Sequence, residues 1–221
     1  MTSPAPLLTV RRLRDRQNDD PAAFAEILRT GLVAHVAVVR DGWPVVLPFA
    51  YGVGDLGQGP RMFLHGSTGG GLFLDASGDG VLVCATVTHL DGLVFARSLF
   101  DSSMNYRSAM IAGRVRPVAP ELAEDALWIV GEHLMPGRRA EIRGNNAKER
   151  AATLVLELPL DQYSVKIRAA GASEAADDGE HRHVWAGVLP LRTVAGTPQP
   201  SPSARDLDVS DSVLRRAAQF A

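Results

Sequence analysis

The chain has 221 residues, of which 46% are hydrophobic, 22% charged and only 6% aromatic, and its formal net charge is −2. A chain of this length forms one large domain, or one domain with extensions, and it buries a core without disulfides or metals. The near balance of charge argues against a protein that binds nucleic acid through bulk positive charge. With one cysteine, Cys84, an intramolecular disulfide and any multi-cysteine metal cluster are excluded.

The sequence offers no sign of a membrane or secretory protein. No apolar run approaches the length of about 18 residues that crosses a bilayer. Near the N-terminus a short apolar patch is followed by arginines and then by acidic residues, which is not the pattern of a signal peptide. These features predict a soluble, cytoplasmic protein with no membrane partner.

Two dipeptides organise the first third of the chain. Asp20-Pro21 predicts the start of a helix, because aspartate caps a helix N-terminus and proline suits the first helical position. Asp41-Gly42 lies between two β-branched, apolar runs, which is the strongest short-range signal for a hairpin. The strands expected here are residues 32–40, 43–53 and 61–65, with a loop at 54–60.

A second Asp-Gly pair, Asp91-Gly92, predicts another hairpin between strands 81–90 and 93–99. A long strand follows at 106–118, in which Gly113 marks a bulge or a close approach. The elements expected after it are a helix at 119–135 stopped by Pro136-Gly137, a short helix at 147–152, strands at 153–158 and 163–168, an apolar segment at 183–191 and an amphipathic helix at 210–220.

This order of elements predicts the fold class. Six or seven strands with hairpin connections and few helices favour a mainly β protein, in which an antiparallel sheet closes into a barrel and the helices pack outside. The regular alternation of strand and helix that builds a nucleotide-binding α/β domain is missing from the pattern, so such a domain is not expected.

A glycine-rich turn, residues 66–71, leads from a strand ending at His65 into a short helix. Backbone N–H groups at such a turn suit an anion such as phosphate, and Ser67 and Thr68 add hydroxyl donors. The turn lacks the lysine of a P-loop and the spacing of the dinucleotide fingerprint. The alternative is a plain turn, which the spacing by itself favours.

A second candidate is the start of the long strand. Alternation places Asn105 and Arg107 on one face and Tyr106 and Ser108 on the other. Arginine is a planar fork that suits phosphate. The alternative is an edge-strand arginine in water beside a half-buried tyrosine.

A third candidate is the strand at 163–168. Alternation predicts Lys166 and Arg168 on one side and Val165 and Ile167 in the core. Only two residues of the chain are lysines, so Lys166 is a candidate donor to a cofactor ring. The alternative is a solvated strand face.

Other chemistry is less well supported by the sequence. His181 and His183 lie beside acidic residues, but the segment has the composition of a flexible loop and offers no preformed metal geometry, so no metal site is predicted. No nucleophile and base stand at a recognisable spacing, and no catalytic residue is assigned. Cys84 is interpreted as a small core residue. Trp185, in a late apolar segment, is a candidate for contact with a partner subunit.

Several blocks taken together carry a family resemblance: FLHGSTGG, VCATVTHLDGLVFARS, SSMNYRSAMIAGRVRPV, PGRRAEIR, SVKIR and HVWAGVLPL occur in this order. The series resembles the flavin-binding proteins of the pyridoxamine 5′-phosphate oxidase-like superfamily, and it is most similar to the branch that includes nitroimidazole-resistance proteins. The resemblance covers residues 20–192. Residues 1–19 are then an N-terminal extension and 193–221 a C-terminal tail.

The resemblance implies an FMN-binding split β-barrel, usually a homodimer with FMN at the subunit interface. It also implies an FMN-dependent oxidoreductase acting on a small molecule, and the flavin performs the redox chemistry in such proteins. The cofactor-binding residues that it implies are Pro48, Phe49, Ala50, Leu64, His65, Gly66, Ser67, Thr68, Asn105, Tyr106, Arg107, Ser108, Lys166, Arg168 and Trp185. The last three would close the site, from the same or the other subunit.

One departure from the family pattern bears on cofactor binding. Relatives commonly carry a basic residue just after the turn, where this chain has Gly70-Gly71-Leu72. Arg107 or Arg97 would have to supply that charge. Two alternatives stay open: a non-catalytic flavin- or nucleotide-binding sensor, and a relative that uses deazaflavin or haem.

Overall fold

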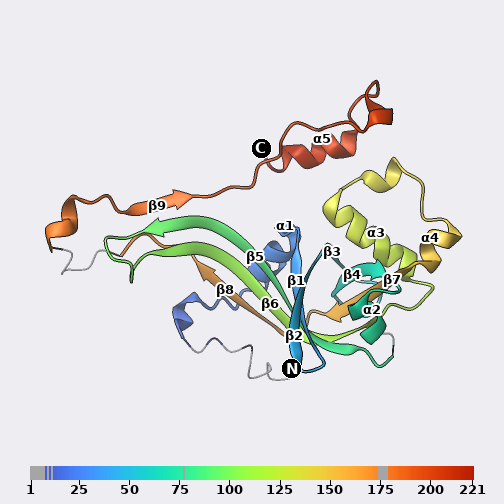
Figure 1. The fold of residues 1–221 in the computed structure, drawn as a ribbon, viewed down its shortest axis with the longest axis horizontal. Coiled ribbons are helices and arrows are strands. Elements are labelled where there is room, and N and C mark those ends of the chain that lie inside the picture. The colour runs from blue at the N-terminus through green and yellow to red at the C-terminus, as the bar shows by residue number, and fades with distance from the viewer. Residues whose placement is uncertain (1–7, 9, 11, 77, 174–178) are drawn as a thin grey trace. The chain divides into compact units, whose positions relative to one another are not determined.

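The computed structural model describes residues 8, 10, 12–76, 78–173 and 179–221 (Figure 1). Contacts divide the chain into two compact units. Unit 1 comprises the described residues of Met1–Gly31, Thr86–Met110 and Tyr163–Thr193. Unit 2 comprises those of Leu32–Ala85, Ile111–Gln162 and Val194–Ala221. Two long strands, β5 (Val81–Phe95) and β6 (Ser103–Pro117), contribute residues to both units.

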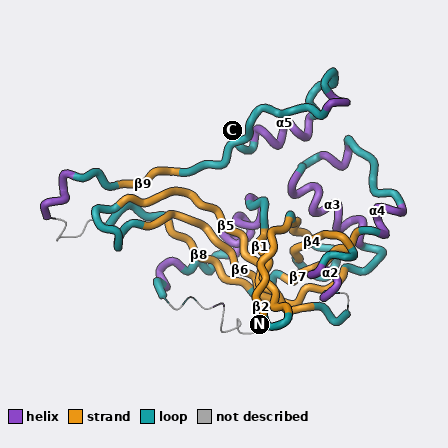
Figure 2. Tube along the Cα trace, in the orientation of Figure 1, coloured by secondary structure: helices purple, strands orange, loops and turns teal. Residues whose placement is uncertain are grey.

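The secondary structure is mainly antiparallel β with flanking helices, which confirms the predicted class (Figure 2). The other strands are β1 (Ala34–Arg40), β2 (Trp43–Phe49), β3 (Tyr51–Gly54), β4 (Arg61–Ser67), β7 (Thr153–Pro159), β8 (Tyr163–Arg168) and β9 (Gly187–Pro190). The helices are α1 (Pro21–Thr30), α2 (Gly71–Asp75), α3 (Ala123–Leu134), α4 (Ala147–Ala151) and α5 (Asp211–Ala218). No helix among the described residues is both long and apolar enough to span a bilayer.

The strands are hydrogen-bonded in the order β2-β1-β5-β6-β7-β4-β3, with β8 paired to β6 and β9 paired to β5. This path has two ends, β2 and β3, so the prediction of a sheet closed into a barrel is wrong for the described residues. The sheet has nine strands rather than six or seven. One reason is that the expected strand 43–53 changes partner at Ala50: β2 pairs with β1, and β3 pairs with β4.

The first Asp-Gly hairpin is confirmed. Asp41 and Gly42 have φ angles of 48° and 79°, and the strands on either side pair from Ala34↔Phe49 to Arg40↔Trp43. Positive φ at both central residues is the requirement of a type I′ turn, whose twist matches that of the strands.

The second Asp-Gly hairpin is wrong. Strand β5 continues through Asp91 and Gly92, neither of which has a positive φ, and Gly92 pairs with Pro190 of β9. The Asp91 carboxylate accepts hydrogen bonds from Arg107 instead of closing a turn. The actual reversal lies after Phe95, where the Ser98 hydroxyl donates to the Asp101 carboxylate at 2.6 Å. Long-range pairing therefore overrides the local turn signal.

Helix α3 packs closely on β3 and β4 in unit 2. Its buried residues Ala126 and Val130 form a core cluster with Phe63 and Val155. Gly52 of β3 lies directly against the backbone of α3, because a Cβ atom at this position would stand 2.6 Å from the Ile129 carbonyl oxygen. The helix begins at Ala123, later than the predicted Ala119, since residues 119–122 form a turn ahead of it.

The N-terminal helix of unit 1 forms as predicted. The Asp20 carboxylate accepts from the Ala22 amide at 2.9 Å and caps α1. The Phe24 ring of α1 stacks on the Tyr163 ring of β8, with centroids 3.7 Å apart. This stacking fixes α1 against the strand that ends in Arg168.

The predicted C-terminal helix is present as α5, and one carboxylate in unit 2 holds its N-terminus. The Ser212 amide and hydroxyl donate to the two Glu141 oxygens at 2.9 and 2.6 Å, and Arg138 donates to the same carboxylate at 2.7 Å. These contacts, led by the Ser212 hydroxyl, lower the pKa of Glu141 from 4.5 to about 2.

We expect the attachment of α5 to weaken in acid. A carboxyl group whose pKa is lower in the folded protein stabilises it fully above pH 4.5, and this contribution is lost as the pH falls from 4.5 towards 2. Glu141→Gln should accelerate proteolysis of α5 at neutral pH, and the exposed Glu121→Gln is the control. Equal protection of α5 in Glu141→Gln and wild type at neutral pH would show that the contact does not hold the helix.

Candidate functional site

The predicted cofactor-binding residues divide between the two units. Residues 48–50 and 64–68 belong to unit 2, whereas residues 105–108, Lys166, Arg168 and Trp185 belong to unit 1. Whether the two groups line the same site stays a prediction.

The glycine-rich turn of unit 2 joins β4 to α2, as the sequence predicts. Its amides are not free, however. Thr68 N–H donates to the Ala152 carbonyl at 3.1 Å, Gly69 N–H to the Ser67 hydroxyl at 3.3 Å and Gly70 N–H to the Ser67 carbonyl at 2.8 Å. The exposed side chains of Ser67 and Thr68 remain the turn's outward-facing polar groups.

A basic side chain that sequence reasoning missed lies at this turn. Arg40, at the end of β1, donates from Nε to Asp75 of α2 at 2.8 Å, and this hydrogen bond raises the pKa of the arginine. The guanidinium lies against Gly71, where a Cβ atom would overlap Nη1, Nη2 and Cζ. The positive charge that is missing from residues 70–72 is therefore supplied by β1. We call Arg40, Ser67, Thr68, Gly71 and Asp75 the turn cluster.

The turn is fixed in place by an aromatic side chain beneath it. Phe73 of α2 is buried, and its ring meets the Phe49 ring edge-on, with centroids 5.8 Å apart. A Cβ atom on Gly66 would lie 2.6 Å from Cζ of Phe73, so the glycine allows α2 to fold back onto β4. Leu64 is fully buried and pairs in the sheet with Tyr51, which anchors this part of β4 in the core.

His65 follows Leu64 on β4 and is exposed on the opposite side of the strand. Partial desolvation by neighbouring protein atoms lowers its pKa below the ordinary value of 6.5. The imidazole is therefore mainly neutral at pH 7, and a neutral imidazole accepts a hydrogen bond or coordinates a metal ion. Nearby, Pro48 is exposed and Ala50 is half-buried.

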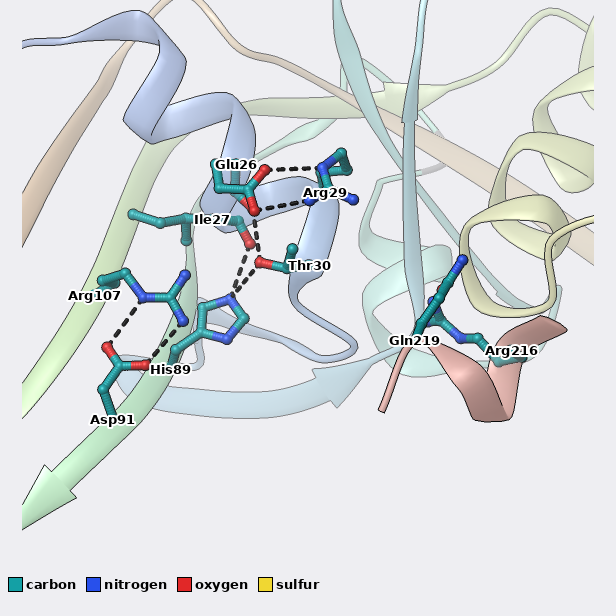
Figure 3. A network of polar contacts seen from close by, with 9 residues as sticks. All are labelled: Glu26, Ile27, Arg29, Thr30, His89, Asp91, Arg107, Arg216 and Gln219. Carbon is teal, nitrogen blue, oxygen red and sulfur yellow. Dashed lines mark hydrogen bonds and ion pairs between the residues drawn. The ribbon is translucent and has the colours of Figure 1, made fainter. Parts of the chain in front are cut away.

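Arg107, predicted to meet a phosphate, is already paired in unit 1. Its Nε and Nη2 donate to the two Asp91 oxygens at 3.0 and 2.8 Å (Figure 3). This bidentate pair raises the pKa of Arg107 and uses the edge of the guanidinium that best fits an oxyanion. On the opposite face of β6, the Ser108 and Thr88 hydroxyls are 2.9 Å apart.

Figure 3 also shows how β5 is joined to α1. His89 Nε2 lies 3.1 Å from the Ile27 carbonyl oxygen and 3.3 Å from the Thr30 hydroxyl. Glu26 forms an exposed ion pair with Arg29 on the same helix. These contacts give His89 a structural role within unit 1.

The alternative of a solvated strand face is wrong for Arg168. Arg168 is only 8% exposed and Val165 is fully buried, whereas Ile167 is half-buried. The guanidinium donates to Asn105 Oδ1 and to the Ala170 carbonyl, which draws it inward at the end of β8. Lys166 is half-buried and bridges Gln17 through its backbone.

The remaining predicted positions give no further cluster. Trp185 is exposed, with its ring centroid 6.1 Å from that of Phe95, and Tyr106 is half-buried. In the described part of the chain, no three metal-binding side chains gather. Two acidic neighbours of the His181 and His183 pair, Asp177 and Asp178, lie outside the described residues.

Comparison with known proteins decides the family. The model of the family described as pyridoxamine 5′-phosphate oxidase matches residues 20–167. The chain belongs to this family. The family predicted from the sequence blocks is therefore confirmed. The curated proteins give no significant match.

Two solved structures resemble nearly the whole chain. The FAD and haem binding protein from Mycobacterium smegmatis is 36% identical, with a TM-score of 0.83 over 91% of this chain and 97% of that one. The flavocytochrome Anf3 from Azotobacter vinelandii is 30% identical, with a TM-score of 0.85 over 96% and 97%. Alignments that cover 91% and 96% of the chain are too complete to leave out all of residues 193–221, so the likeness extends into the segment predicted as a tail.

A third structure shares the fold at lower identity. The putative 5-nitroimidazole antibiotic resistance protein from Bacteroides thetaiotaomicron is 22% identical, with a TM-score of 0.56 over 68% of this chain and 86% of that one. The fold expected from the nitroimidazole-resistance branch is thus present, while the two structures of higher identity cover more of the chain.

Proposed function

We propose that this protein is a flavin-binding oxidoreductase that also binds haem. The observation that carries the proposal is the likeness to the FAD and haem binding protein and to the flavocytochrome, at 36% and 30% identity over more than nine-tenths of both chains. FMN, expected from the family resemblance, is one candidate flavin, and FAD is the other. When bound, these groups supply the electron-transfer chemistry, and the protein binds and orients them.

The turn cluster supports a flavin phosphate. Arg40 uses Nε for Asp75, while Nη1 and Nη2 lie against Gly71 at the turn. Ser67 and Thr68 of the same turn are exposed. A cation and hydroxyl donors around an exposed turn fit a phosphate group.

Two histidines of unit 2 fit a haem ligand. His35 and His65 are exposed, and neither makes a side-chain hydrogen bond to another described residue. His35 lies on a β1–β2 face whose other residues are apolar: Ala37, Val39, Pro44, Val46 and Pro48. An apolar surface carrying an imidazole suits a haem, whose iron is commonly held by histidine.

The same face supports the proposed homodimer. Val39 and Val46 are 67% and 57% exposed on the terminal hairpin of the sheet. Contiguous exposed apolar residues mark interaction sites more often than isolated ones do. We therefore propose that a second copy of the chain covers the end of this face that carries Val39 and Val46, beyond His35.

The test is the absorption spectrum of the purified protein, with its mass in solution measured on the same sample. We expect flavin bands and a Soret band, FMN or FAD released on denaturation, and the mass of a dimer. Either His35→Ala or His65→Ala should shift or remove the Soret band. A colourless protein that takes up neither flavin nor haem would overturn the proposal, as would uptake of a deazaflavin alone.

A second measurement separates catalysis from binding. The bound flavin should be reduced by NADH, NADPH or an electron-transfer protein and reoxidised by an acceptor. Flavin that binds tightly but resists every donor would favour the alternative of a non-catalytic sensor.

A further inference from the structure

Arg168 is a buried cation without an anionic partner among the described residues. It is 8% exposed, and its three hydrogen bonds go to neutral acceptors: Asn105 Oδ1, the Ala170 carbonyl and the Gly171 carbonyl. Arginine side chains stay charged inside proteins. A buried charge is costly unless it is paired, so this arrangement calls for a counter-charge.

The unused donors lie on one edge of the guanidinium. Nη1 makes two of the hydrogen bonds, whereas Nη2 makes only the longest one, at 3.4 Å to Gly171. Nε is shielded from solvent and has no hydrogen-bond partner in the described part of the chain. Nε and Nη2 form the edge that binds the two oxygens of a carboxylate or phosphate side by side.

Arg107, in the same unit, shows how this edge of a guanidinium binds a carboxylate. Its Nε and Nη2 hold the two Asp91 oxygens at 3.0 and 2.8 Å. Arg168 presents the same pair of atoms with no carboxylate of a described residue against them.

The neighbours of Arg168 do not need its charge to stay in place. Asn105 Nδ2 donates to the Ala170 carbonyl at 3.1 Å, and the Ala170 amide donates to Asn105 Oδ1 at 3.2 Å. These two groups therefore satisfy each other in both directions. A purely structural role would leave the buried positive charge with neutral acceptors only among the described residues.

We propose that the Nε–Nη2 edge of Arg168 binds an oxyanion of a bound cofactor: a haem carboxylate where the flavin phosphate lies at the turn cluster, and the flavin phosphate where it does not. Binding displaces the long contact to Gly171, the weakest of the three. The inference rests on the proposed function, and it assigns to Arg168 the recognition of the acidic group rather than of the ring.

The test compares ligands that differ only in that acidic group. Affinities of wild type, Arg168→Lys and Arg168→Met are measured for FMN and riboflavin, and for haem and its dimethyl ester. We expect Arg168→Met to weaken one acidic ligand about 10- to 100-fold, the range for a hydrogen bond to a charged group, and to leave its uncharged analogue unchanged. Arg168→Lys should fall between, because it keeps the charge and loses the paired edge.

The acidic ligand that loses affinity in Arg168→Met identifies the source of the oxyanion. A loss for FMN indicates a flavin phosphate, and a loss for haem indicates a haem carboxylate. Equal affinities of wild type and Arg168→Met for all four ligands, or equal losses within each pair, would overturn the inference while the proposed function stands. A wild-type protein that binds none of the four, and no FAD, would overturn both.

Thermal unfolding of the ligand-free variants is a second test, in which stability should not fall although ligand affinity does. Removing an unpaired buried charge should leave Tm unchanged or raise it, so Arg168→Met should be at least as stable as wild type. The matched control is Arg107→Met, which removes both hydrogen bonds of a bidentate pair with Asp91 and should lower Tm. A drop for Arg168→Met as large as that for Arg107→Met would show a structural role and overturn the inference.

Discussion

Gly52→Ala should lower the free energy of unfolding by about 1–3 kcal/mol, the usual cost of overpacking a core. The added Cβ would lie 2.6 Å from the Ile129 carbonyl oxygen and 2.7 Å from the Val130 Cα. Both are backbone atoms of α3, so no side-chain rotation relieves the overlap. The helix must move as a whole, and it carries Ala126 and Val130 of the core cluster.

Urea denaturation of three variants tests this expectation. Gly54→Ala places its Cβ 2.7 Å from Cδ1 of Ile129, the end of a flexible side chain, and should cost less. Gly196→Ala meets no atom within 4 Å and should leave stability unchanged. Equal stability of Gly52→Ala and Gly196→Ala would contradict the close packing of α3 on β3.

Arg40→Gln should weaken FMN or FAD binding about 10- to 100-fold, the range for loss of a charged hydrogen bond to phosphate. The glutamine removes the cation at the turn cluster. Asp75 loses its ion-pair partner at little cost, since its carboxylate is partly solvated. Folding should change little, because exposed ion pairs contribute about 0–1 kcal/mol.

Fluorescence titration with FMN and riboflavin tests the role of Arg40. The loss should be confined to FMN, since riboflavin lacks the phosphate. The control is Arg143→Gln, which breaks an exposed ion pair with Glu149 elsewhere in unit 2. Equal affinity of Arg40→Gln and Arg143→Gln for FMN would place the phosphate away from the turn.

Signals that depend on neighbouring residues were predictable from the sequence. The Asp20 cap, the Asp41-Gly42 turn and the strand–turn–helix after His65 all form as expected. Each is governed by φ and ψ preferences and hydrogen bonds within a few positions. The ordered blocks also identified the family, because together they are far more specific than any single motif.

Signals that depend on distant partners were not predictable. Asp91-Gly92 has the composition of a hairpin turn but is held extended by β9 and Arg107. Arg168 has the spacing of an exposed strand residue, yet Asn105 and Ala170 draw it into the interior. In both cases a tertiary hydrogen bond outweighs a local preference of about 1 kcal/mol or less.

The composition excluded an intramolecular disulfide and multi-cysteine metal clusters, and the sequence blocks determined the family and most elements of the fold. Only the tertiary structure placed Arg40 at the turn that lacks a basic residue of its own, and only it showed that no described residue offers an anion to the charged edge of Arg168. The physical reason is that charge compensation is a property of side chains brought together by strand pairing. The order of residues along one strand does not contain it.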